Sequence, residues 1–365
     1  MGKKLNFAVL GSGNGGRAFC GQIAAKGYPV MMYEPLEQTP DFLKLMEEKE
    51  MFLKGDIMIG GKLRGVTMDI KEAVDGADVI FIVVPSFAHP PIFRKMIPYL
   101  KDGQRVIIVP GNYGGFLLKK MMSDYDVNPD ISISEAASLP YACRISDFNT
   151  VMIYKRKFQM KIATSPGKGR PAVLDIMNDV FRDTVEFFAG SNLLEIDLDN
   201  INYTLHPLPL LLNYGEIEKH PETFRHYMDG VTPLISEQMM KMDEERLALG
   251  HTLGLSLIST MDQLKMYYGQ NDCRTYYEFV NSPESPYKDI VGHNVRSRYI
   301  VEDVPCLHVP AIELAGLVDI RMPVSELCVG LSSQLHAVEY ASEGTTLAKL
   351  GLAGKAVGEI FTLAS

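Results

Sequence analysis

A glycine-rich turn near the start of the chain has the spacing of a phosphate-binding loop. Residues 11–16 read Gly-Ser-Gly-Asn-Gly-Gly and follow an apolar run over residues 7–10 that is typical of a buried strand. In the pattern G-x-G-x-x-G, the first glycine permits a tight turn, the second lets the backbone approach a pyrophosphate, and the third lets the next helix pack closely. We therefore predict a dinucleotide here; the alternative is a turn that only serves packing. The predicted contacts are Gly11, Gly13, Asn14, Gly15 and Gly16.

An acidic residue stands where the cofactor ribose would need a hydrogen-bond acceptor. Glu34 ends the next strand-like run, 23 residues after Gly11. A carboxylate at this place accepts from a ribose 2′-hydroxyl and repels a 2′-phosphate, so the sequence favours NAD over NADP.

Two further strand-like runs end in loops that could face the same ligand. Ser86 follows the run 79–84, and Asn112 lies in the loop 110–115. Ligands of open parallel sheets bind at the carboxyl ends of the strands. We predict that Ser86 contacts the cofactor and Asn112 the substrate, although both loops could be ordinary strand exits.

One histidine suits the acid–base chemistry that accompanies hydride transfer, which needs a side chain titrating near neutral pH. Of the eight histidines, His206 is followed by Pro207, which fixes the local backbone, and Asn213 lies seven residues later. A lone histidine can equally be a core or surface residue.

A second charged segment, residues 296–305, could assist that histidine. It contains Arg298, Glu302 and Asp303. Arginine suits carboxylates and phosphates, and a carboxylate behind a histidine fixes its tautomer. An exposed, salt-bridged loop is the other interpretation.

The elements that must position these residues change character along the chain. Up to residue 165, strand-like runs alternate with helical stretches, which predicts an α/β Rossmann domain over residues 1–165. Later residues show the three- and four-residue spacing of helices, which predicts an all-helical domain over residues 166–365. Expected strands are 5–10, 30–33, 79–84, 105–109, 130–134 and 151–164, and expected helices are 11–25, 41–53, 172–182, 201–214, 231–249, 261–268 and 311–365.

The composition excludes several classes of protein. The net charge of −9, from 36 basic and 45 acidic residues, argues against a nucleic-acid-binding protein. The apolar runs are far shorter than the roughly 18 residues of a membrane span. Five scattered cysteines fit reduced thiols in the cytoplasm, and the histidine spacing predicts no metal site.

These features together resemble the opine dehydrogenase family, the octopine and nopaline dehydrogenase group, over nearly the whole chain. The match rests on residues 11–16, 110–115, 138–144, the stretch from Asn202 through His206-Pro207 to Asn213, and the segment 298–305. The resemblance implies an oxidoreductase that condenses an amino acid with a 2-oxo acid such as pyruvate and reduces the imine with NADH. It also implies that His206 is the acid–base residue, that Asp303 orients it, and that Arg298 contacts the cofactor pyrophosphate. The substrate contacts that we expect are Asn112, Cys143, Tyr203 and Asn213.

Two other functions stay open on the residues alone. One is an NAD-dependent dehydrogenase of a hydroxy acid or sugar acid in the same superfamily, and the other is a non-catalytic NAD-sensing protein. The sequence determines neither the amino acid nor the oxo acid nor the direction of the reaction, and it leaves a homodimer open.

Overall fold

The chain forms two units, each with its own core. The computed structural model describes residues 4–36, 38–270, 272–288, 290–291 and 294–365. One unit contains Met1–Ile196 and Leu363–Ser365, and the other contains Asp197–Thr362. The predicted boundary at residue 165 is therefore too early. It falls at the end of strand β11 (Gln159–Ser165), and the next strand, β12 (Glu186–Ala189), still pairs with β11 in the first unit.

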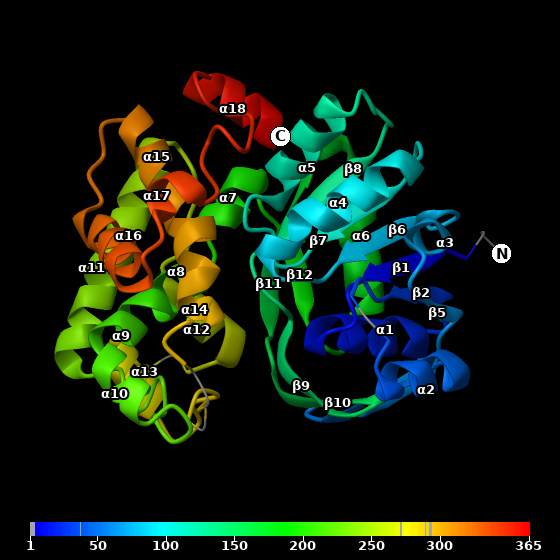
Figure 1. Cartoon of the computed structure of the whole chain (residues 1–365), viewed down its shortest axis with the longest axis horizontal. Coiled ribbons are helices and arrows are strands. Elements are labelled where there is room, and N and C mark those ends of the chain that lie inside the picture. The colour runs from blue at the N-terminus through cyan, green and yellow to red at the C-terminus, as the bar shows by residue number, and fades with distance from the viewer. Residues whose placement is uncertain (1–3, 37, 271, 289, 292–293) are drawn as a thin grey trace. The chain divides into compact units, whose positions relative to one another are not determined.

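The first unit is built on a mostly parallel sheet (Figure 1). The strands lie in the order β12-β11-β8-β7-β6-β1-β2-β5, and β11 runs antiparallel to β8. The remaining strands of this sheet are β1 (Phe7–Leu10), β2 (Val30–Tyr33), β5 (Gly65–Thr67), β6 (Val79–Ile82), β7 (Arg105–Ile108) and β8 (Ser132–Ala136).

Helices cover both faces of this sheet because its central strands are apolar on both sides. On one face, Phe81 of β6 contacts Phe19, whose ring also packs against Phe181, just after α6. On the other face, the core includes Leu10 and Ile82 with Phe93 of α4. The helices of the unit are α1 (Asn14–Ala25), α2 (Pro40–Glu48), α3 (Ile70–Val74), α4 (His89–Met96), α5 (Gly114–Asp124), α6 (Arg170–Val180) and α7 (Leu193–Leu198), with 3-10 turns η1 (Ser86–Ala88), η2 (Ile97–Tyr99) and η3 (Gly167–Gly169). The predicted Rossmann-type fold is confirmed.

A second sheet packs against α1 and was not predicted as such. Its order is β4-β3-β10-β9, made by β3 (Glu50–Gly55), β4 (Ile59–Lys62), β9 (Tyr141–Asp147) and β10 (Thr150–Arg156). The helix expected to continue to residue 53 ends at Glu48, where Lys49 adopts a left-handed conformation. The stretch 151–164, expected as an extension or hairpin at the edge of the sheet, is two strands in different sheets, β10 and β11.

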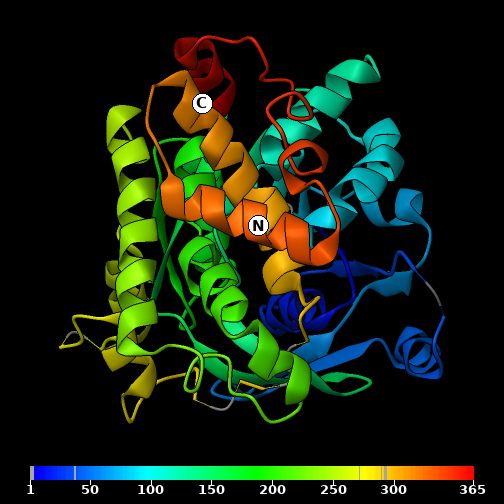
Figure 2. The same cartoon turned by 60° about the vertical axis from the view of Figure 1, so that its left-hand side comes forward.

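The second unit consists of helices, as predicted. They are α8 (Asn202–Leu205), α9 (Pro207–Leu212), α10 (Tyr214–Lys219), α11 (Pro233–Thr252), α12 (Thr260–Tyr268), α13 (Tyr276–Asn281), α14 (Arg298–Val301), the π-helix η4 (Val304–His308), α15 (Val309–Leu317), α16 (Pro323–His336), α17 (Tyr340–Glu343) and α18 (Val357–Ala364). Figure 2 shows the long α11 in yellow-green beside the shorter helices that pack on it, among them α8, α9 and α16. Within the described ranges, no helix is both long and apolar enough to cross a membrane.

A buried ion network ties these helices together. Arg246 of α11 is fully buried and bonds both Asp243 at 2.6 Å and Asp199 at 3.0 Å. Its guanidinium also donates to the backbone oxygens of Leu198 and Ile258. Such a group is stable in an interior only when its charge and its donors are satisfied, as they are here.

Candidate active site

The glycine turn has the geometry that its spacing predicts. Gly11 has a φ of 118°, in the region that favours glycine, and a Cβ there would strike the carbonyl oxygen of Val83. A Cβ on Gly16 would overlap the carbonyl oxygen of Gly11, so the third glycine allows α1 to start directly against the turn. Gly11 and Gly16 are therefore required by packing.

Gly13 differs from Gly11 and Gly16, because neither its backbone conformation nor the surrounding packing requires a glycine. Its φ is −73°, and a Cβ there would meet no heavy atom of the described residues within 4 Å. The space above Gly13, beside the first amides of α1, is what a phosphate group needs for close approach. The turn therefore fits a dinucleotide pyrophosphate.

Asn14 and Gly15 of the turn lie against β9 and the segment that leads into it. A Cβ on Gly15 would come within 2.9 Å of the Leu139 side chain, and Asn14 Oδ1 accepts a 2.8 Å hydrogen bond from the Ile145 amide. The Asn14 side chain thus anchors β9, so a cofactor would meet this residue through its backbone amide.

Glu34 lies beside the turn, at the end of β2. The backbone amide of Gly11 donates to the Tyr33 oxygen at 3.0 Å, which brings the two strand ends together. The Glu34 carboxylate accepts from the Ser12 hydroxyl and, at 2.8 Å, from the Leu36 amide. This placement fits the predicted ribose contact.

Ser86 and Asn112, expected on neighbouring strand exits, meet each other. Asn112 Nδ2 donates to Ser86 Oγ at 2.7 Å, and both side chains are buried. Asn112 has a φ of 48°, in the left-handed region that asparagine tolerates better than most residues. The pair lies beyond the ends of β6 and β7, which are adjacent in the sheet.

Cys143 is a buried residue of β9 and is unsuited to nucleophilic attack. Burial raises the pKa of its thiol to about 12, although the charge of Arg144 acts in the opposite direction. A thiol with this pKa stays protonated at neutral pH. Cys143 is therefore unsuited to be a nucleophile, and its expected place in the substrate wall stays a prediction.

In the helical unit, the predicted acid–base pair is assembled. His206 lies between α8 and α9, where Pro207 starts the second helix, and Asp303 immediately precedes η4. His206 Nδ1 and Asp303 Oδ2 are 2.6 Å apart, and the two residues are 5% and 1% exposed. A carboxylate on Nδ1 fixes the imidazole tautomer and leaves proton exchange with a substrate to Nε2.

The charge of the pair depends on its surroundings. Burial raises the pKa of Asp303 to about 8, although the positive charge of Arg298 works against this rise. Burial alone would lower the pKa of Arg298, but the carboxylates of Glu302 and Asp303 more than compensate and raise it. With its pKa raised by these carboxylates, the Arg298 guanidinium keeps a positive charge next to the pair.

The prediction from the sequence missed one residue in contact with His206. The Tyr299 ring stacks on the imidazole, with ring centroids 3.6 Å apart and planes 12° apart. Its position next to Arg298 in the charged segment was the available signal.

Two predicted substrate contacts have other partners in the structure. Tyr203 is 1% exposed, and its hydroxyl lies 2.7 Å from Ser325 Oγ. Its ring stacks on His308 at 4.0 Å, so the structure gives Tyr203 a packing role, and the expected substrate contact stays a prediction. Asn213 donates to the backbone oxygens of Pro209 and Gly230 at 2.8 and 2.9 Å, so it could offer a substrate only its side-chain oxygen.

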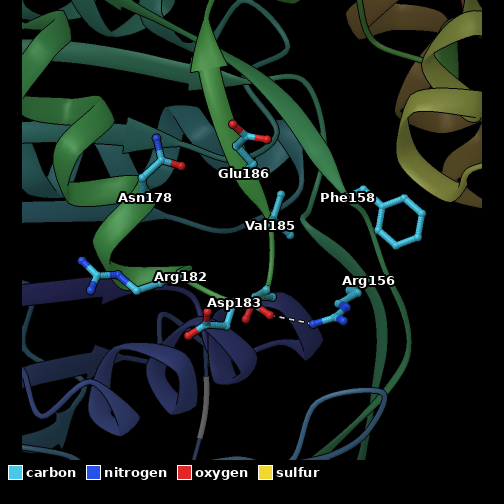
Figure 3. A pocket seen from close by; sticks show the side chains of 8 residues that line it. Arg156, Phe158, Asn178, Arg182, Asp183, Val185 and Glu186 are labelled. Carbon is cyan, nitrogen blue, oxygen red and sulfur yellow. Dashed lines mark hydrogen bonds between the residues drawn. The ribbon is translucent and has the colours of Figure 1, made fainter.

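An open pocket of about 480 Å³ lies elsewhere in the first unit (Figure 3). It is lined by the end of β10, the start of β12 and the connection after α6, with Arg156 donating to the Asp183 backbone oxygen. None of its lining residues was predicted for the site. Among the described residues, no group of three or more His, Cys, Asp or Glu side chains could hold a metal ion.

Comparisons with known proteins agree with both halves of the chain. Residues 6–116 match the sequence model of the NAD-dependent glycerol-3-phosphate dehydrogenase N-terminus, and residues 189–336 match that of the NAD/NADP octopine/nopaline dehydrogenase alpha-helical domain. The opine dehydrogenase of Arthrobacter sp. (strain 1C) is 33% identical over 362 residues, covering 97% of each chain.

Two solved structures share the fold. One is octopine dehydrogenase with NADH and L-arginine, with a TM-score of 0.80, 19% identity and coverage of 99% of each chain. The other is NADP+-bound yersinopine dehydrogenase, with a TM-score of 0.76, 17% identity and coverage of 96% of this chain and 98% of that one.

Proposed function

The chain belongs to the opine dehydrogenase family of NAD(P)-dependent oxidoreductases, and from this premise we propose that it joins an amino acid to a 2-oxo acid, such as pyruvate, by NADH-dependent reductive condensation. The observation that carries the proposal is the buried 2.6 Å pair of His206 and Asp303. It supplies an oriented acid–base group of the kind that imine formation and reduction require.

The residues of the first unit would hold the cofactor. Gly13 and the first amides of α1 would receive the pyrophosphate, and Glu34 would accept from the adenosine ribose. When bound, NADH supplies the hydride that reduces the imine carbon. We propose that Arg298, which keeps an exposed positive charge, contacts the cofactor pyrophosphate, and that Ser86 lies near the cofactor and Asn112 near the substrate.

The acid–base role falls to His206. The amine adds to the oxo carbon and gives a carbinolamine, whose hydroxyl must leave as water for the imine to form. His206 Nε2 donates the proton to this leaving hydroxyl, and Asp303 stabilises the imidazolium before the transfer. In the oxidative direction the same nitrogen accepts a proton. Cys143 then forms part of the substrate wall, and the Asn213 oxygen is a second candidate contact.

The direct test measures NADH consumption for a matrix of amino acids against pyruvate, oxaloacetate, glyoxylate and 2-oxoglutarate, with NADPH run in parallel. We expect turnover only when both an amine and an oxo acid are present. Equal turnover without the amine would indicate a hydroxy-acid dehydrogenase instead. Tight NADH binding with no turnover for any pair would favour an NAD-sensing protein.

The acid–base role of His206 is tested by removing its imidazole. His206→Ala should lower kcat by roughly 100-fold or more, since general acid–base catalysis contributes about 10² to 10⁴. Undiminished turnover at saturating substrate would remove His206 from the chemistry. Lys219→Ala, at the exposed end of α10, is the control for a neighbouring change on the surface of the same unit.

Two expectations about the whole protein remain predictions. A homodimer would be tested by light scattering, and a cytoplasmic location by fractionation of cells.

A further inference from the structure

Two aromatic residues that the mechanism above does not use lie beside His206. The Tyr299 ring stacks on it at 3.6 Å, and the His226 ring meets Tyr299 edge-on at 4.6 Å. We propose that Tyr299 is a positioning residue, which holds the His206 ring on its hydrogen bond to Asp303 and stabilises that ring when it carries a positive charge. This proposal rests on the proposed function, because it assigns a role relative to His206.

The geometry constrains the imidazole in two independent ways. The hydrogen bond from Nδ1 to Asp303 fixes which ring edge faces the carboxylate. The stacked Tyr299 ring, whose plane is 12° from parallel to the imidazole, prevents the imidazole from tilting out of that bond. Tyr299 is itself 6% exposed. Its hydroxyl also interacts with that of Tyr227.

The chemistry of a tyrosine face suits a cationic imidazole. An aromatic face carries partial negative charge, so it attracts a cation that lies over it. The ring charge is also affected by Asp303 on Nδ1, by the nearby buried carboxylate of Glu302, and by the positive charge of Arg298, which opposes protonation. His226, whose ring centroid lies 6.4 Å away, is the remaining titratable neighbour. Tyr299 is the neutral group on the ring face, so a change at Tyr299 alone alters the face without altering these charges.

A pair of substitutions separates the ring face from the hydroxyl. Tyr299→Phe keeps the face and removes only the hydroxyl, whereas Tyr299→Leu keeps an apolar side chain and removes the face. Two readouts are compared for each variant. One is the pH dependence of kcat/KM in the reductive reaction, and the other is the NMR titration of the His206 ring in the free enzyme. The His206 signal is assigned with His206→Ala.

We expect Tyr299→Phe to titrate like the wild type. In Tyr299→Leu the midpoint for the protonated histidine should move about one pH unit lower, since the cationic ring loses its favourable neighbour. We also expect kcat to fall about tenfold, with KM for the oxo acid nearly unchanged. Equal midpoints in Leu and Phe variants, or a titration unaffected by either, would overturn the proposal.

Two provisions keep the result decisive. Should Tyr299→Leu fail to fold, pentafluorophenylalanine at the same position keeps the shape and reverses the charge of the ring face, and the same downward midpoint is expected. Unchanged titration in that variant counts against the proposal. A wild type without condensation activity would refute the proposed function, but the NMR titration would still decide the role of Tyr299.

Discussion

The Asp303→Asn substitution is the sharpest test of the acid–base pair, because it changes one charge and preserves the shape of the side chain. Asp303 Oδ2 lies 2.6 Å from His206 Nδ1, and both residues are buried. A charge-assisted hydrogen bond contributes about 1.5–3 kcal/mol. Two unit charges about 4 Å apart interact by about 4 kcal/mol at an effective dielectric constant of about 20. At 1.4 kcal/mol per tenfold in rate, we expect kcat to fall roughly 10- to 1000-fold.

The assay is the initial rate of NADH consumption at saturating amino acid and oxo acid, measured across the pH range. The matched control is Glu302→Gln, which removes a neighbouring buried carboxylate but leaves the His206 hydrogen bond in place. We expect a much smaller loss for this control. Equal losses in the two variants, or a loss below about threefold in Asp303→Asn, would show that Asp303 does not act through His206.

The same substitution has a consequence for stability with a defined sign. Burial raises the pKa of Asp303 to about 8, so below that pH the folded protein keeps a proton in the hydrogen bond between Asp303 and His206, whereas an ordinary aspartate of the unfolded chain releases its proton near pH 4. The free energy of unfolding of the wild type therefore decreases as the pH rises between these values. Asp303→Asn lacks this term, so its melting temperature relative to the wild type should increase with pH. A difference that stays constant from about pH 5 to about pH 8 would contradict the assigned environment.

Two further predictions concern the cofactor turn. Gly13→Ala should weaken NADH binding at least tenfold with little change in melting temperature, because its Cβ would enter only the space above the turn. Gly16→Ala should also destabilise the apoprotein, by about 1–3 kcal/mol, because its Cβ would overlap Gly11. Similar melting temperatures for the two variants would disprove this distinction. Glu34→Gln should improve NADPH binding about tenfold, because it removes a negative charge whose repulsion of a nearby 2′-phosphate is worth about 1–4 kcal/mol. Fluorescence titration measures both affinities. An unchanged ratio of NADPH to NADH affinity would argue against a ribose contact.

The parts of the fold that the sequence predicted are those governed by local interactions. The glycine turn is defined within six residues, and each required glycine acts on its immediate neighbours, as the overlap of a Gly16 Cβ with Gly11 shows. The second sheet depends on pairings between distant segments, such as Phe52 in β3 with Thr150 in β10. No local spacing specifies that pairing. The amphipathic pattern of the charged stretch continues into β3, so the predicted helix extended beyond the end of α2.

The domain boundary was misplaced for a related reason. Strand β12 is only four residues long, and it follows α6 in a stretch that otherwise has helical spacing. Its place in the sheet depends on pairing with β11, for instance Gln159 with Glu186. Short edge strands carry little periodicity, so only the pairing itself reveals them.

The acid–base pair of His206 and Asp303 could be predicted only in part from the residues themselves. His206 and Asp303 are 97 residues apart, and the residues alone left His206 one histidine among eight. The resemblance to a known family selected the pair, and the structure places the two side chains in contact. The packing of Tyr203 could not be predicted in this way, since its stack on His308 joins residues 105 positions apart.

The spacing within the charged segment explains why these particular residues act together. Tyr299 and Asp303 are four residues apart in a helical stretch, as are Arg298 and Glu302, and residues at this spacing lie on one face of a helix. One face therefore presents the stacking ring and the carboxylate to His206, while the next face brings the charge of Glu302 near Arg298 and raises the pKa of its guanidinium. Because each residue rotates the helix by about 100°, one inserted residue between Tyr299 and Asp303 would separate the stack from the hydrogen bond. The spacing, more than any single residue type, is thus what a sequence must keep to retain this site.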